Sequence, residues 1–378
     1  MKSITLAKKD FCTGCLACAN VCSQNAIRIL TEQEGFYYPY ILKDKCTKCG
    51  KCMDVCYILN NNLKSNKDCD KFYFGKNSNT KKQETSQSGG AFWAIAEYIY
   101  SGKGVVYGAA LDDKFQTRHV RTLNAETGKK LKGSKYVQSY IGNTYRRAQR
   151  DLKNGRKVLF SGTPCQIAGL YSYLNTKRES IENLFTCDLI CHGVPSPRIF
   201  HSYLKFMEDK YYKKVARFNF RDKAFGWGSH LESFTYHDTS SISKHYYADL
   251  FYNNCILRPS CGNCKFCNCN RVSDITIGDC WGIEKFNPRY FDEKGVSLIL
   301  INTKKGEDIL EKITPFLTYS KIEKRFVMQR NLKEPTEVSP IREKFWSCYL
   351  NKGFGTVLRK YTSYGIINRL KLMIFKEL

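Results

Sequence analysis

The chain has 378 residues, of which 42% are hydrophobic and 14% aromatic, so a folded protein with a sizeable core is expected. Its 61 Lys and Arg residues outnumber its 35 Asp and Glu residues, and the formal net charge of +26 favours acidic partners. The first residues lack the apolar stretch of a signal peptide, and no apolar run is long enough to span a membrane, so a cytoplasmic location is expected.

Two cysteine-rich runs lie close together near the N-terminus. Each run has the spacing C-x-x-C-x-x-C-x-x-x-C, which is typical of ferredoxin modules that carry two [4Fe–4S] clusters. In such modules the fourth cysteine of each run binds the cluster of the other run. The spacing therefore predicts one cluster at Cys12, Cys15, Cys18 and Cys56, and a second at Cys46, Cys49, Cys52 and Cys22.

Disulfides and structural zinc are the alternatives for these cysteines. A reducing compartment disfavours disulfides, and zinc sites usually present cysteine pairs and not duplicated four-cysteine runs. Bound clusters would lower the net charge to about +20, which is still strongly basic. We expect no nucleic-acid binding, because no helix-turn-helix, RNP-like or zinc-finger pattern accompanies the charge.

Residues 1–60 are predicted to form the ferredoxin-type domain, with a small hairpin between the cysteine runs. Residues 61–85 are rich in Asn, Lys and Ser and are predicted to be a linker, in which Cys69 is a free thiol. A helix is predicted over 90–101 from the spacing of its apolar residues. Its start, at Ser88, Gly89 and Gly90, suits a phosphate group, although an ordinary capped helix also fits the pattern.

Strands are predicted over 104–111 and 119–123, and a basic, aromatic segment follows them. Lysine, tyrosine and hydroxyl side chains together suit a dinucleotide, although a solvated basic loop fits equally well. The residues concerned are Lys130, Lys132, Lys135, Tyr136, Gln138 and Ser139.

Two strand–loop–helix units come next, after a helix predicted over 145–154. In the first, Thr163 and Cys165 head a helix whose dipole favours a thiolate. In the second, Cys191 and His192 follow a strand, in the middle of which Cys187 is expected to be part of the core. This alternation indicates an α/β domain with its functional groups at the carboxyl ends of the strands.

A third cysteine-rich stretch and a basic tail complete the chain. The pair Cys261 and Cys264 is followed by Cys267, Cys269 and Cys280, and spacing alone allows a zinc knuckle or a third cluster. A strand and an amphipathic helix are predicted next. Residues 341–378 are predicted to form a basic amphipathic tail, which either rests on an anionic membrane or partner or packs on its own domain.

Taken in this order, the segments resemble the beta-subunit family of coenzyme F420-reducing hydrogenases and dehydrogenases over residues 12–302. The resemblance implies an α/β (α+β mixed-sheet) flavoprotein domain, with residues 86–170 and 171–340 as its N-terminal-like and C-terminal-like regions, fused to a bacterial-type ferredoxin domain. The motifs that carry the resemblance are the two cysteine runs, QSGGAFWAIAEY, GSKYVQS, FSGTPCQIAGL, DLICHGVPSP and RPSCGNCKF…NRVSDITIGDCWGI.

The resemblance also implies FAD and a third [4Fe–4S] cluster. A structural hydrogen bond is the favoured role for His192, and no catalytic residue is predicted. The third cluster would use Cys165, Cys191, Cys261 and Cys264, with Cys267 as the best competitor. The FAD contacts would be Ser88, Gly89, Gly90, Lys135, Tyr136, Gln138, Ser139 and Thr163.

This cofactor set implies an oxidoreductase that passes electrons between a two-electron hydride carrier and one-electron clusters. A redox partner protein, either ferredoxin-like or a partner enzyme, is expected. The hydride carrier could be F420, a nicotinamide or an organic substrate such as a sugar derivative, and the family also implies a role in polysaccharide biosynthesis. The alternatives are an electron-transfer subunit without its own substrate and a metal-stapled nucleic-acid binder.

Overall fold

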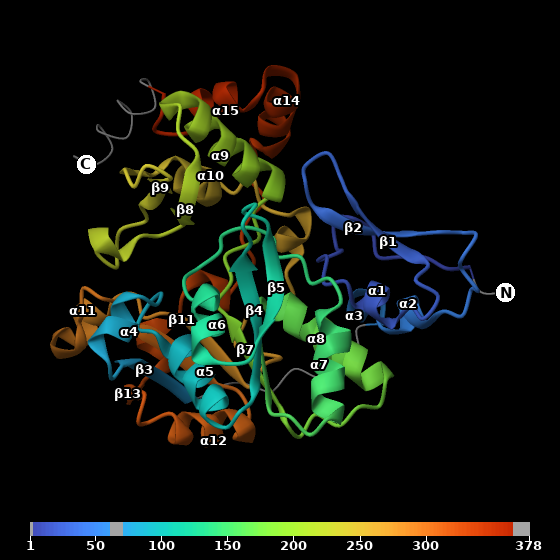
Figure 1. Cartoon of the computed structure of the whole chain (residues 1–378), viewed down its shortest axis with the longest axis horizontal. Helices are drawn as coiled ribbons and strands as arrows, with labels where there is room; N and C mark the ends of the chain where they lie inside the picture. The colour runs from blue at the N-terminus through green and yellow to red at the C-terminus, as the bar shows by residue number, and fades with distance from the viewer. Residues whose placement is uncertain (1–2, 61–70, 366–378) are drawn as a thin grey trace.

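A computed structural model describes residues 3–60 and 71–365 of the chain. These residues form an N-terminal module (residues 3–60), a large α/β body and a second, aromatic-rich subdomain (Figure 1). The strands form three sheets, of two, eight and three strands. In the part of the chain that is described, no helix is both long and apolar enough to cross a membrane.

The N-terminal module consists of a β-hairpin and three short helices. The hairpin pairs its strands in antiparallel register, from Ile27 opposite Ile41 to Thr31 opposite Tyr37, and confirms the hairpin predicted between the cysteine runs. The elements are α1 (Ala17–Val21), β1 (Ile27–Thr31), β2 (Tyr37–Ile41), α2 (Lys51–Asp54) and α3 (Tyr57–Asn60).

The α/β body is built on a mixed eight-stranded sheet. Its central strands β4, β6, β7 and β11 are parallel neighbours, and the outer pairings are antiparallel. This arrangement confirms the α/β, mixed-sheet class expected from the sequence. In sheet order the strands are β13 (Leu317–Ile322), β3 (Lys71–Asn77), β12 (Ser297–Ile301), β11 (Ile275–Asp279), β7 (Leu184–Leu189), β6 (Val158–Ser161), β4 (Val105–Leu111) and β5 (Thr117–Thr122).

The predicted linker over 61–85 is wrong for its second half. Residues 71–77 form strand β3 inside the sheet, and α4 (Thr80–Glu84) follows it. The reason is the alternation of Phe72 and Phe74, which are 0% and 4% exposed and face the core although Lys- and Asn-rich sequence flanks them. Cys69, predicted to be a free thiol, lies outside the described residues.

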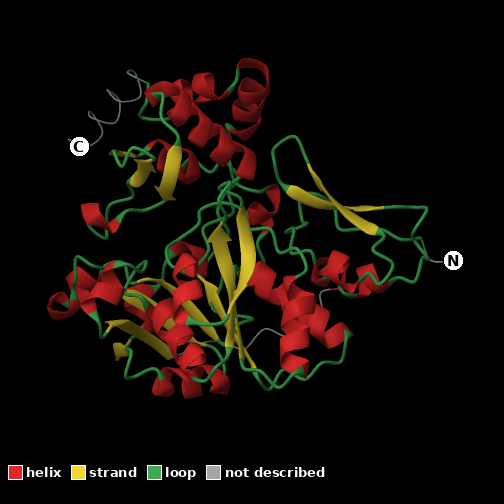
Figure 2. Ribbon diagram, in the orientation of Figure 1, coloured by secondary structure: helices red, strands yellow, loops and turns green. Residues whose placement is uncertain are grey.

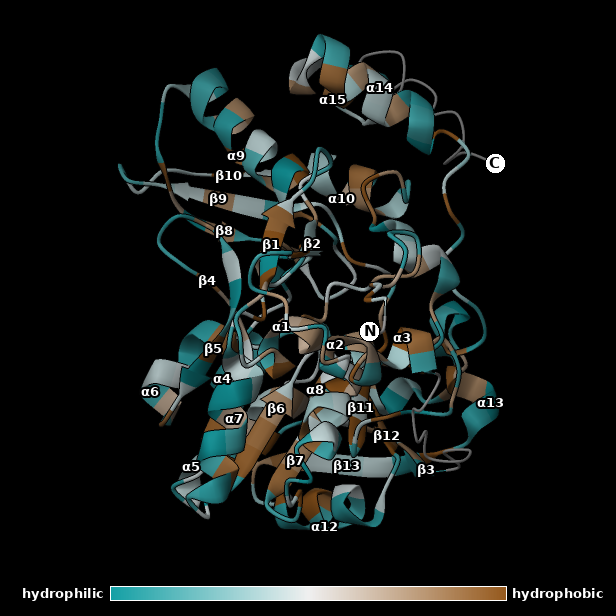
Figure 3. Cartoon of the chain, turned by 90° about the vertical axis from the view of Figure 1, so that its right-hand side faces the viewer, coloured by the Kyte–Doolittle hydropathy of each residue, from teal (hydrophilic) through white to brown (hydrophobic). Residues whose placement is uncertain are grey.

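Helices cover both faces of the large sheet (Figure 2). On one face, α5 (Ala91–Ser101) and α12 (Lys304–Lys312) pack on a cluster that includes Cys187, which is buried as predicted. On the other face, α7 (Thr144–Lys153) and α8 (Pro164–Thr176) pack on Tyr107 and Phe160. Strands β6 and β7 between these layers are hydrophobic (Figure 3), as expected for strands buried on both sides.

The aromatic subdomain packs a three-stranded antiparallel sheet against helices. Its elements are α9 (Pro197–Tyr211), β8 (Val215–Asn219), β9 (Glu232–Tyr236), β10 (Ser241–Lys244), α10 (Tyr246–Tyr252), α14 (Arg342–Lys352) and α15 (Phe354–Tyr361). Val357 and Leu358 of α15 are fully buried against this subdomain. The described part of the predicted tail therefore packs on its own domain, and residues 366–378 lie outside the described residues.

Short helices occupy the remaining connections. The α-helices among them are α6 (Ala125–Gly128), α11 (Ile283–Phe286) and α13 (Lys324–Val327). The 3₁₀ helices are η1 (Lys129–Leu131), η2 (Lys223–Phe225), η3 (Pro259–Asn263), η4 (Pro288–Tyr290) and η5 (Arg330–Leu332).

The N-terminal module is docked on both other parts of the molecule. Its α1 shares a hydrophobic cluster with α8. Arg146 of α7 donates to the carbonyl oxygens of Asn20 at 2.6 Å and Cys22 at 2.7 Å, at the end of α1. At the hairpin tip, Glu34 forms a bidentate ion pair with Arg342 of α14. These contacts place the cysteine runs beside the amino end of α8.

Candidate functional site: three cysteine groups and a cavity

The cysteines of the N-terminal module fall into the two groups that their spacing predicts. Burial, followed by the charges of the Cys12 and Cys56 thiols, raises the pKa of Cys15 to about 12. The same three thiols surround Cys18, whose pKa is raised first by burial. In the second group, burial and then the thiols of Cys22 and Cys46 raise the pKa of Cys52. Cys49 of that group is exposed.

The local backbone suits thiolate ligands. The amide of Ala26 donates to the Cys22 sulfur at 3.3 Å, which favours a negatively charged sulfur. Among the described residues, no three His, Cys, Asp or Glu side chains are close enough together to hold a single metal ion. A [4Fe–4S] cluster sets its ligands farther apart than one ion does, because each thiolate binds a different iron.

A third group of cysteines converges in the α/β body. Cys165 lies in the first turn of α8, Cys191 follows β7, and Cys261 and Cys264 lie on and just after η3. Burial and then the thiols of Cys261, Cys165 and Cys264 raise the pKa of Cys191. The fold thus brings together the four cysteines that the resemblance singles out. We call them the proximal group.

The additional cysteines have different surroundings. Cys267 is 7% exposed and lies within hydrogen-bonding reach of Cys264, so it borders the proximal group. Cys269 and Cys280 belong to a separate hydrophobic cluster beneath β3 and β12, where the Cys269 thiol contacts the Met328 sulfur at 3.8 Å. Of these three cysteines, Cys267 alone therefore competes for a ligand position in the proximal group.

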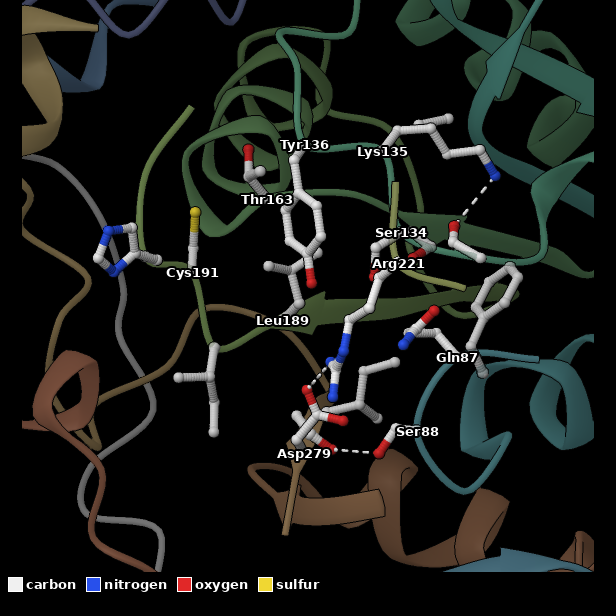
Figure 4. Close-up of a pocket in the computed structure, with 18 of the residues that line it drawn as sticks. Gln87, Ser88, Ser134, Lys135, Tyr136, Thr163, Leu189, Cys191, Arg221 and Asp279 are labelled. Atoms are coloured by element: carbon white, nitrogen blue, oxygen red, sulfur yellow. Dashed lines mark hydrogen bonds and ion pairs between the residues drawn. The ribbon is translucent and has the colours of Figure 1, made fainter. Parts of the chain in front are cut away.

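A cavity of about 500 Å³ opens between the large sheet and the aromatic subdomain. The parallel strands β6, β7 and β11 end at it, which is the usual position of ligand sites in α/β folds. Its lining includes Cys191 of the proximal group. In Figure 4, Thr163 and Cys191 lie toward one end of the cavity, and Gln87 and Ser88 lie toward the other.

Six of the eight predicted FAD contacts line this cavity. They are Ser88, Gly90, Lys135, Tyr136, Ser139 and Thr163. Gly89 instead packs on the sheet, where an added Cβ would lie 2.3 Å from the Gly75 oxygen. Gln138 faces the N-terminal module, and its side-chain oxygen accepts a hydrogen bond from the Tyr37 amide at 3.2 Å. These two residues shape the site from outside the cavity.

The amino end of α5 faces the cavity with backbone amides. Gly90 caps the helix in the left-handed conformation, at φ +84°, and Ala91, Phe92 and Trp93 line the cavity. The Ser88 hydroxyl donates to the Val296 oxygen at 2.9 Å. Ser88 therefore anchors the loop, while the first amides of the 11-residue helix offer the positive end of the dipole.

Lys135 does not direct its charge as the sequence suggested. Its ammonium group donates to the carbonyl oxygens of Lys130, Lys132 and Gly133 at 3.0, 2.6 and 3.1 Å (Figure 4). Desolvation lowers its pKa to about 7. Its observed role is to close the loop that forms one wall of the cavity. Lys132, which also lines the cavity, lies 4.5 Å from the centre of the Trp93 ring.

Several polar residues of the cavity carry no sequence signal that could have identified them. Arg221 donates to Asp279 at 2.7 Å and lies 4.9 Å from the centre of the Trp281 ring. Buried His119 contacts the Ser139 hydroxyl at 2.7 Å and the Ser161 carbonyl at 2.9 Å. Burial lowers the pKa of His119 to about 4, so its ring is neutral and buttresses the wall.

His192 has the structural role that the sequence favoured. Its Nε2 contacts the Asn254 side-chain oxygen at 2.8 Å, and its ring lies edge-on to Phe251. Burial lowers its pKa, and the neutral ring fits this packing.

Comparisons with known proteins agree with this architecture. Residues 155–324 match the family described as the C terminus of the coenzyme F420 hydrogenase/dehydrogenase beta subunit, and residues 11–58 match the 4Fe-4S dicluster domain. A solved chain of the F420-reducing [NiFe] hydrogenase complex from Methanosarcina barkeri, from a xenon derivatization study, is 16% identical with a TM-score of 0.49. The similarity covers 79% of this chain and 94% of that chain. No curated protein matches.

The fold and the cysteine groups define an iron–sulfur protein of the oxidoreductase class, with a dicluster ferredoxin domain joined to an α/β body. Within that body, residues 155–324 belong to the beta-subunit family of coenzyme F420 hydrogenases and dehydrogenases, as the sequence motifs predicted. The dicluster domain accounts for two [4Fe–4S] clusters.

Proposed function

We propose that the protein is an iron–sulfur flavoprotein oxidoreductase that passes electrons between a hydride carrier and one-electron acceptors or donors. The observation that carries this proposal is the cavity that is lined at once by the amino end of α5 and by Cys191 of the proximal group. Bound FAD would exchange electron pairs as hydride and single electrons with clusters.

The cavity residues fit a flavin dinucleotide. A volume of about 500 Å³ lies within the usual range for cofactor sites. The amides at the start of α5 suit the pyrophosphate, because they offer unpaired donors and a positive dipole end. Tyr136, Tyr252 and Trp281 offer aromatic surfaces for ring packing.

The proximal group fits a third [4Fe–4S] cluster. Four buried thiols close to one another favour a shared metal centre, because thiolate–metal bonds replace protons that burial otherwise retains. The Val194 amide donates to the Cys261 sulfur at 3.3 Å, a contact that favours the thiolate. The ligands would be Cys165, Cys191, Cys261 and Cys264, with Cys267 adjacent.

The path of the electrons follows α8. Cys165 lies at its head, and Gly169 lies one turn further along on the same face. An added Cβ at Gly169 would lie 2.8 Å from the Cys15 Cβ, so the inner ferredoxin cluster sits directly against this helix. Electrons would then pass from the cavity through the proximal group and the inner cluster to the outer cluster at exposed Cys49.

The hydride carrier is proposed from chemistry and family together. Coenzyme F420 is the carrier that the family description names. A nicotinamide and a sugar derivative are the alternatives, the latter in line with a role in polysaccharide biosynthesis.

An electron-transfer subunit without its own substrate is the second candidate function. The strongly basic chain, with a formal charge of +26, and the exposed outer cluster cysteine favour docking to a partner enzyme. In that case electrons would reach the protein only through the partner.

Anaerobic reduction assays on the reconstituted holoprotein test the proposal. Reduced F420, NADH, NADPH and nucleotide sugars are each added, and flavin bleaching and reduction of a ferredoxin are followed separately. We expect one donor to bleach the flavin and to reduce ferredoxin. The variant C49S, which lacks an outer-cluster ligand, should retain bleaching and lose ferredoxin reduction, whereas C348S should keep both.

Two other results would decide against this function. Bleaching by dithionite but by none of the donors, with activity restored by a partner, would establish the electron-transfer role without a substrate. A protein that binds no flavin would contradict both the hydride chemistry and the assignment of the cavity.

A further inference from the structure

Three arginine side chains are fully buried, and one of them has no carboxylate partner. Arg221 pairs with Asp279 at 2.7 Å, and Arg271 pairs with Asp188 at 3.0 Å. Within residues 3–60 and 71–365, Arg258 forms no ion pair although it is 2% exposed. An uncompensated buried charge costs several kcal/mol, so a negative group is expected near Arg258.

The guanidinium of Arg258 points into the first cysteine run. Its Nε donates to the Cys12 carbonyl at 2.8 Å, and one terminal nitrogen donates to the Tyr37 carbonyl at 3.1 Å. The other terminal nitrogen, Nη1, is buried and has no hydrogen-bond partner among the described residues. It lies beside Gly14, where an added Cβ would be 3.0 Å from Nη1.

The second cysteine run supplies an internal comparison. Both runs begin Cys-Thr-x-Cys, with Gly14 in the first and Lys48 in the second, and both residues have positive φ, +68° and +56°. Lys48 is exposed, whereas Gly14 lies against the buried guanidinium of Arg258. The arginine therefore distinguishes the inner cluster from the outer one, although their ligand patterns are the same.

The surroundings of Arg258 hold its charge away from water. Its guanidinium lies 4.1 Å from the centre of the Tyr38 ring and 5.5 Å from that of Phe36. The nearest carboxylate on the hairpin, Glu34, is already paired with Arg342. Because no anion of the described residues neutralises it, the counter-charge has to come from what the cysteines bind.

We propose that Arg258 is the counter-ion of the inner [4Fe–4S] cluster, bound by Cys12, Cys15, Cys18 and Cys56, and that its Nη1 donates a hydrogen bond to a sulfur of that cluster. A cluster with four thiolates is negative in both redox states and gains one further negative charge on reduction. A buried cation stabilises the reduced state more strongly, so Arg258 raises the reduction potential of the inner cluster above that of the outer one.

Arg258 also joins the inner cluster to the proximal group. Its amide donates to the Val194 carbonyl at 2.9 Å, and its own carbonyl accepts from the Cys261 amide at 2.9 Å. The residue is therefore fixed by the loop that carries the proximal cysteines and contacts the inner cluster through its side chain. The inference rests on the dicluster domain alone and does not depend on the flavin or on the proximal cluster.

Redox titration of the holoprotein, followed by electron paramagnetic resonance, tests the proposal. The inner signal is assigned as the one lost in C18S. In R258M it should shift to lower potential by at least about 59 mV, a tenfold change in its oxidised-to-reduced ratio for one electron. R258K keeps the charge and should recover most of the shift. K48M, at the exposed position of the other run, should leave the inner signal unchanged.

Iron content gives a second measurement where R258M is less stable. Loss of about four irons in R258M but not in R258K would support the counter-ion role, because charge and not shape would then be required. An unchanged inner potential in R258M with full iron content would overturn the proposal. Equal iron loss in R258M and R258K would also overturn it, since geometry alone would explain that result.

Discussion

Glu232 is a buried carboxyl in the aromatic subdomain. It is 0% exposed and accepts hydrogen bonds from the Tyr203 hydroxyl at 2.7 Å and the Tyr247 amide at 3.0 Å, while its second oxygen has no partner among the described residues. Burial raises its pKa from 4.5 to about 7. Because the folded state favours the protonated form, the carboxyl stabilises the fold least at high pH.

We expect E232Q to remove this pH dependence. In the wild type, unfolding free energy should fall by about 3 kcal/mol as the pH rises from about 4.5 to about 7, and the neutral amide avoids that loss. Denaturant unfolding at pH 5 and pH 8 measures it. E232Q should gain on the wild type between the two pH values, whereas the exposed-site control E343Q should not. Parallel behaviour of E232Q and the wild type would contradict this interpretation.

At the scale of single residues, the sequence revealed what has a pattern and missed what depends on burial. The spacing of the cysteines alone grouped Cys12 with Cys56 and Cys22 with Cys46. Arg258 could not be found in this way, because a lone arginine becomes informative only when its partners and exposure are known. Lys135 shows the opposite error, since a basic residue in a suitable motif turned inward to its own loop.

At the scale of elements, α8 connects the proximal group to the inner cluster through a close contact. Gly169 is a helix residue at which an added Cβ would lie 2.8 Å from the Cys15 Cβ and 2.9 Å from the Tyr145 hydroxyl. Alanine is normally the better helix former by about 1 kcal/mol. The close packing against Cys15 explains why glycine is needed at this position.

G169A should therefore destabilise the holoprotein, by about 1–3 kcal/mol, since the N-terminal module must shift away from α8. The control is G355A in α15, where the added Cβ would meet Phe206 at an ordinary 3.5 Å and where stability should be unchanged or higher. Thermal unfolding together with iron content measures both variants. A G169A protein as stable as G355A would show that the module does not rest on this contact.

Elements were predictable where their periodicity was continuous. The helix at 90–101, the hairpin and the alternation of strands and helices follow from local sequence, and the structure contains each of them. Strand β3 was missed because its two phenylalanines stand between Lys- and Asn-rich segments that resemble a linker. The strand order, with β3 between β12 and β13, depends on contacts between residues over 200 positions apart and has no local signal.

At the scale of the whole molecule, the outer cluster cysteines lie at a basic surface. Cys49 is exposed beside exposed Lys45 and Lys51. A groove of about 320 Å³ next to α1 is lined by further cations, among them Arg146, Arg150, Lys153 and Lys177. This surface suits an acidic redox protein.

Electron exchange with an acidic ferredoxin should therefore slow by about tenfold or more as salt is raised from low to physiological concentration. The double variant K45E/K51E should slow the exchange at low salt, and K344E on the distant α14 should not. Stopped-flow measurement of the second-order rate constant tests this. A rate independent of salt and of both charge reversals would place partner docking elsewhere.

The cofactor content of anaerobically reconstituted protein tests the central claim most directly. We predict about twelve irons and one FAD per chain, with about four irons lost in C165S and none lost in C267S. Eight irons in the wild type would contradict the proximal cluster. Twelve irons without FAD would contradict a flavin site in the cavity between the sheet and the aromatic subdomain.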